Sequence, residues 1–114
     1  MAINKVQDGK RLRLTVASGT KSGDPVVIGA HHGVALTDYN ASDGKADIDT
    51  EGVFDLSVKG VDGSGSSAVA VGDKIYYVSG DTPKLSKKAT GENYAIACGA
   101  VASGATATIP VKLI

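Results

Sequence analysis

Several residue types that often mark reactive, disulfide-bonded or aromatic-rich proteins are scarce in this chain of 114 residues. Cys98 is the only cysteine, so no disulfide can form within the chain, and its apolar neighbours predict a small buried side chain. Tryptophan is absent, and phenylalanine and methionine occur once each. The core must therefore be thin, because most of the remaining apolar residues are alanine and valine.

The chain also lacks a net charge, because twelve basic residues balance twelve acidic ones. Nucleic-acid binding and docking on an anionic membrane both normally rest on a basic excess, so we expect neither partner. No run approaches the roughly 20 apolar residues of a membrane span. The first residues have no apolar signal segment, so we expect synthesis in a cytoplasm.

Residues that could carry chemistry are few. His31 and His32 are the only histidines, and neighbours on an extended strand point to opposite faces, so the pair alone is a poor metal site. Acidic residues cluster in one stretch, but their spacing does not match a calcium loop. They are Asp43, Asp47, Asp49, Glu51 and Asp55. We interpret them as a solvated face or as the charged side of a contact, and expect no enzyme activity, no metal and no cofactor.

Glycine and β-branched residues predict an all-β fold. Fifteen glycines supply tight turns, and thirteen valines fit a pleated sheet better than a helix. Polar and apolar residues alternate most clearly over residues 11–16, 53–58 and 105–113. About nine short strands with frequent turns indicate a small antiparallel β-barrel or sandwich.

Residues 1–9 are expected to form an N-terminal arm and residues 10–114 a single β domain. Pro110 has no amide hydrogen, so the last strand should lie at a sheet edge or contain a bulge. Residues 23–28 (GDPVVI) are similar to residues 72–77 (GDKIYY), and each segment is followed by a small-residue strand. A barrel of two similar halves would give this pattern, and so would a coincidence between glycine turns.

Local basic charge is concentrated near the N-terminus, at Lys5, Lys10, Arg11 and Arg13. This cluster is either a solvated strand edge or a surface that meets an acidic partner. The glycine-rich residues 60–65 (GVDGSG) lack the lysine and the following helix of a phosphate-binding loop, so we interpret them as a hairpin tip.

Six segments carry a resemblance that covers nearly the whole chain. They are residues 4–9, 22–27 (SGDPVV), 33–38 (GVALTD), 51–56 (EGVFDL), 72–77 (GDKIYY) and 108–113 (TIPVKL). Together they resemble the small tailed-phage decoration proteins known as capsid cement proteins. The shared motifs are turn-and-strand patterns and not catalytic signatures.

The resemblance implies a structural protein of the bacteriophage virion that binds the exterior of the expanded head and stabilises the capsid without catalysis. It also implies the major capsid protein as partner, commonly with a homotrimer on the outer capsid surface, after synthesis in the host bacterial cytoplasm. On this basis we expect the arm to reach a neighbour or the shell. The expected capsid contacts are Lys5, Lys10, Arg11 and Arg13.

An alternative is a virion surface module that binds a cell-surface glycan or receptor. Sugar sites favour exposed aromatic rings, and the candidates are Tyr39, Tyr76, Tyr77 and Tyr94. Tyr76 and Tyr77 are adjacent, so on a strand one should lie in the core and the other in solvent. An enzyme is the more remote alternative.

Overall fold

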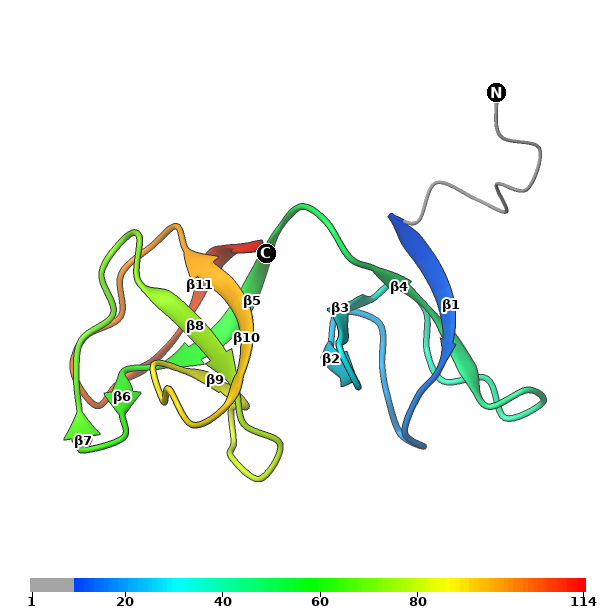
Figure 1. Cartoon of the computed structure of the whole chain (residues 1–114), viewed down its shortest axis with the longest axis horizontal. Helices are drawn as coiled ribbons and strands as arrows, with labels where there is room; N and C mark the ends of the chain where they lie inside the picture. The colour runs from blue at the N-terminus through cyan, green and yellow to red at the C-terminus, as the bar shows by residue number, and fades with distance from the viewer. Residues whose placement is uncertain (1–9) are drawn as a thin grey trace. The chain divides into compact units, whose positions relative to one another are not determined.

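The computed structural model describes residues 10–114, and these residues form eleven β-strands and no helix (Figure 1). Residues 10–114 therefore contain no helix that could cross a membrane. The chain divides into two compact units, the first ending at Glu51 and the second beginning at Gly52. The all-β prediction is confirmed. A single domain over residues 10–114 stays a prediction, and each unit is described by itself.

The N-terminal unit is an open, four-stranded antiparallel sheet in the order β1-β4-β3-β2. Its strands are β1 (Arg11–Thr15), β2 (Pro25–Ile28), β3 (His31–Ala35) and β4 (Lys45–Asp49). Small and β-branched side chains from all parts of the sheet form one core, with half-buried Leu14, Ile28 and Tyr39 packed against it. The buried core residues are Val16, Val26, Ala35, Ala46 and Ile48.

The C-terminal unit is a closed five-stranded barrel in the order β10-β11-β5-β9-β8. Its strands are β5 (Val53–Lys59), β8 (Lys74–Tyr77), β9 (Leu85–Ser86), β10 (Glu92–Ala97) and β11 (Thr106–Leu113). Strand β9 closes the barrel, because it pairs parallel with β5 and antiparallel with β8. A separate two-stranded hairpin is formed by β6 (Val61–Asp62) and β7 (Gly65–Ser66).

The two units share one architecture. If β9 is set aside, the barrel order β5-β11-β10-β8 repeats the order β1-β4-β3-β2 of the N-terminal unit. The register repeats as well. In each unit, three residues on three neighbouring strands are paired in a line, and the two lines lie at equivalent positions. These lines are Leu12, Ile48 and Ala35 in the first unit, and Phe54, Val111 and Ala97 in the second.

The same glycine turn precedes β2 and β8. In the first unit, Gly23 N donates to Ala35 O (2.7 Å) and Ala35 N donates to Asp24 O (2.9 Å). The Asp24 carboxylate accepts a bond from Lys21 N (2.9 Å), and Asp24 N donates to Lys21 O (3.0 Å). In the second unit, the same four bonds measure 2.8–3.1 Å. They join the corresponding residues Gly72, Ala97, Asp73 and Ala70.

Positive backbone φ angles explain why both turns need glycine. They are 91° at Gly23 and 94° at Gly72, a region that side chains disfavour. The similarity of residues 23–28 to residues 72–77 therefore reflects two similar halves, one of the two explanations that the sequence left open.

The units differ in the connection that follows β2 or β8. A two-residue turn, Gly29-Ala30, joins β2 to β3, whereas residues 78–91 join β8 to β10 and contain β9. The N-terminal unit consequently has no equivalent of β9 among its described residues. Two of its core side chains are less buried than their barrel equivalents: Val16 and Val26 are 8% exposed, and Val58 and Ile75 are 0% exposed.

Two local expectations are wrong. Pro110 lies inside β11, which pairs with both β5 and β10, so it is not on an edge strand, and neither pairing has a register shift that would mark a bulge there. The sheet tolerates it because β10 ends at Ala97, beside Pro110, and only Cys98 N donates to the Pro110 carbonyl (2.9 Å). Cys98 is exposed and not buried, because the preceding Ala97 faces the core and adjacent residues of an extended chain point to opposite faces.

Candidate functional site

The basic residues predicted to touch a partner lie along β1. Lys10 directly precedes the strand, and Arg11 and Arg13 are exposed on it, while the alternate Leu12 and Leu14 are half-buried. The period-two alternation of the sequence therefore sorts charge and core onto opposite faces. Lys5 and the rest of the predicted arm lie outside the described residues.

Acidic residues of β4 lie directly opposite these arginines. The antiparallel register pairs Arg11 with Asp49 and Arg13 with Asp47. Side chains paired in this way across two strands are close enough to interact. We call this surface the charge face. It consists of Arg11, Arg13, Asp43, Asp47 and Asp49.

Arg13 is the centre of the charge face. Its Nε and Nη2 atoms donate to Asp43 Oδ2 at 3.1 and 2.8 Å, and its Nη1 donates to Asp47 Oδ1 at 3.0 Å. The hydrogen bond from Arg13 is the largest cause that lowers the pKa of Asp43, and the same bond raises the pKa of Arg13. The guanidinium charge is thus shared with two carboxylates, although all three side chains remain about 40% exposed.

The structure therefore changes the interpretation of two sequence features. Two residues of the basic cluster, Arg11 and Arg13, and three of the acidic stretch, Asp43, Asp47 and Asp49, form one face of alternating charge. Charged residues recur every second position in residues 11–13 and in residues 47–49, and the register of β1 and β4 places the two sets opposite each other. That register depends on pairing across thirty residues and more, which local patterns do not define.

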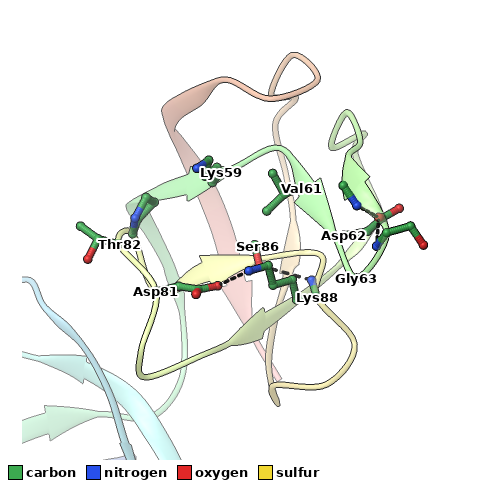
Figure 2. Close-up of a pocket in the computed structure, with 11 residues that line it drawn as sticks. Lys59, Val61, Asp62, Gly63, Asp81, Thr82, Ser86 and Lys88 are labelled. Atoms are coloured by element: carbon green, nitrogen blue, oxygen red, sulfur yellow. Dashed lines mark hydrogen bonds and ion pairs between the residues drawn. The ribbon is translucent and has the colours of Figure 1, made fainter.

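A second surface feature is an open pocket of about 440 Å³ in the C-terminal unit (Figure 2). Charged side chains of both signs line it, and Lys88 Nζ lies 2.8 Å from Asp81 Oδ2. The Asp62 carboxylate accepts bonds from the amides of Ser64 and Gly65, at 2.8 and 3.1 Å, and so holds the β6–β7 turn. These contacts satisfy the pocket's acidic groups internally.

Histidines contribute little to either feature. His31 and His32 begin β3 and pair with Ile28 and Val27 across the tight turn. Among residues 10–114, no group of three or more His, Cys, Asp or Glu side chains is arranged to hold a metal ion.

The tyrosines offer no exposed platform for a sugar ring. Tyr94 is fully buried and packs edge-on against Tyr77, with 6.0 Å between ring centroids. Tyr39, Tyr76 and Tyr77 are half-buried, so the expectation that one of the adjacent pair is core and the other exposed is wrong. A β-bulge between Asn93 and Ala95 disturbs the simple alternation on β10, beside this pair.

Comparison with known proteins identifies the class to which this structure belongs. The family model described as phage cement protein matches residues 6–113, nearly the whole chain. No curated protein and no solved structure shows significant similarity to this chain. The chain therefore belongs to the phage cement protein family. Membership gives it a structural role in stabilising the phage capsid, with which it associates as part of the virion.

Proposed function

We propose that this protein attaches to the exterior of the expanded phage head as a homotrimer and stabilises it without catalysing a reaction. The observation that carries the proposal is the family match, which spans residues 6–113 and so includes both compact units. Its direct partner is then the major capsid protein. The outer capsid surface is its final location, after synthesis in the host bacterial cytoplasm.

The charge face supports a contact in which the partner is recognised by its pattern of charges and not by its net charge. Two arginines and three aspartates alternate on it, so a partner must present charges in the matching order. Such complementarity contributes more to specificity and register than to affinity. Modest affinity at each site is sufficient for a protein held at several linked sites, because the linked contacts gain avidity.

Co-sedimentation with undecorated heads tests the proposed function. Purified protein is mixed with expanded and with unexpanded heads of the phage that encodes it, and the bound fraction is measured against protein concentration. We expect saturable binding to expanded heads alone. Equal binding to both forms would refute recognition of the expanded lattice, and no binding to either form would refute the function itself.

A matched pair of charge reversals tests the predicted contact residues. Lys10 precedes β1 and is exposed, and Lys112 is an exposed lysine on the barrel strand β11. We expect Lys10→Glu to weaken binding to heads, and Lys112→Glu to leave it unchanged. Deletion of residues 1–9, which include Lys5, should leave the fold intact and abolish attachment. Unimpaired attachment of the shortened chain would exclude the arm as a contact.

A further inference from the structure

Strand β9 shows what completes this architecture. It is only two residues long, yet Leu85 is 0% exposed and Ser86 is 1% exposed. Leu85 pairs with Val58 on one side and with Tyr77 on the other, so β9 closes the barrel and places one buried apolar side chain at the closure. Figure 1 shows β9 among the strands of the barrel. The five strands thus form a closed sheet, in which β9 pairs with the last two residues of β5 and of β8.

The equivalent place in the N-terminal unit can be located from the shared register. Val58 corresponds to Val16, and Tyr76 and Tyr77 correspond to Val27 and Ile28. Val16 is 8% exposed, while Val27 and Ile28 are half-buried. We call the place between the end of β1 and the end of β2, where the sheet has no strand equivalent to β9, the notch: Val16 and Ile28 face the core beside it, and Val27, which points to the opposite face, adjoins it through its backbone.

Backbone hydrogen bonding shows that β2 can accept another strand at this notch. Ala35 N donates to Asp24 O, and the antiparallel register then directs Val26 and Ile28 toward β3. Val27 lies between them, so its N–H and C=O point away from β3. Within residues 10–114, β2 and β1 each have a single strand partner. The corresponding Tyr76 in the barrel lies opposite Ser86 of β9.

We infer that an extended segment of the capsid protein occupies this notch and completes the N-terminal barrel. The inference rests on the proposed function, which supplies the capsid as partner. The occupant's chemistry follows from β9: a short strand, parallel to β1 and antiparallel to β2, with one leucine-like side chain that packs between Val16 and Ile28. Main-chain bonds to Val27 and one apolar pocket together are the usual means of binding an added strand.

A loop graft tests this inference by closing the notch within the chain. In the closed variant, residues 78–91, which contain β9, replace Gly29-Ala30. In the control variant, a glycine-serine segment of the same length replaces the same two residues. We expect the closed variant to bind expanded heads at least tenfold more weakly than the control, and its Val27 amide to exchange hydrogen more slowly. Equal binding by the two variants would overturn the inference.

A cross-linking experiment gives an answer even if the grafted chain does not fold. Cys98 is exposed, so it is replaced by serine, and Val27→Cys then carries a benzophenone probe on decorated heads. We expect cross-links to the capsid protein, and none from the same probe at Lys112→Cys. Cross-links from Val27→Cys to a second copy of this chain would overturn the inference. Failure of the unmodified protein to sediment with heads would instead refute the proposed function.

Discussion

Two equivalent leucines allow the effect of barrel closure to be measured within one molecule. Leu14 on β1 and Leu56 on β5 occupy the same place in the two repeated sheets, opposite Ala46 and Ile109 respectively. Leu56 is 5% exposed in the closed barrel, whereas Leu14 is half-buried in the open sheet. The same substitution to alanine should therefore have different costs.

The expected costs follow from the carbon atoms removed. Leu→Ala deletes three carbons, and at about 0.8 kcal/mol for each buried group the transfer term is roughly 2.4 kcal/mol. A cavity in the closed barrel adds to this term, so we expect Leu56→Ala to lower the free energy of unfolding by about 3 kcal/mol. Water can fill the space left by Leu14→Ala, and we expect a cost of about 1 kcal/mol there.

Hydrogen exchange in increasing urea can assign each cost, because it reports on β1–β4 and on the barrel strands separately. The expected difference of about 2 kcal/mol corresponds to a factor of roughly 30 in the equilibrium constant for opening. Costs that agree within about 0.5 kcal/mol would refute the reasoning, since the open and closed sheets would then bury this position equally well. Proline substitutions are avoided, so that the comparison concerns packing alone.

Three further predictions concern stability. Leu85→Ala should lower the free energy of barrel unfolding by about 3 kcal/mol, measured in urea, because Leu85 is 0% exposed; a cost below about 1 kcal/mol would show that β9 does not close the core. Gly23→Ala and Gly72→Ala should each cost about 1–2 kcal/mol in thermal unfolding, because both φ angles are near 90°. The control is Gly63→Ala, which should be nearly neutral, because φ is not positive there and an added Cβ meets nothing within 4 Å. Stability should fall as the pH drops below about 4, because hydrogen bonds from the Ala70 amide and then from the Lys87 side chain lower the pKa of Asp73, and Arg13 lowers the pKa of Asp43. These contributions to stability are present above the unfolded-state pKa and are lost as the carboxylates of the folded state become protonated. Asp73→Asn should therefore flatten the fall in stability at acid pH, and an unchanged fall would contradict the assignment.

Local sequence patterns predicted the strands well, because alternation is a property of neighbouring residues. The segments 11–16, 53–58 and 105–113 all became strands with the expected faces. The repeated glycine turn was visible for the same reason, since Gly23 and Gly72 each serve a four-residue turn. These features need no knowledge of distant pairing.

Features that depend on distant pairing were not predictable from the sequence. Pro110 was expected at an edge, but the length of its neighbour β10 decides whether a missing amide matters. Arg13 was expected to face solvent or an acidic partner, and its bonds to Asp43 and Asp47, thirty or more residues away, were not foreseen. The closing strand β9 is hard to recognise in the sequence, because two residues carry almost no periodic signal.

The short Gly29-Ala30 turn has a consequence for solubility. It leaves β1 and β2 with exposed edges, and such edges promote aggregation between sheets of different molecules. Pro25 on β2 has no amide hydrogen to offer an incoming strand, and Arg11 and Arg13 place exposed charged side chains along β1. These residues make indiscriminate edge-to-edge pairing unfavourable, so the incomplete sheet can persist without aggregating.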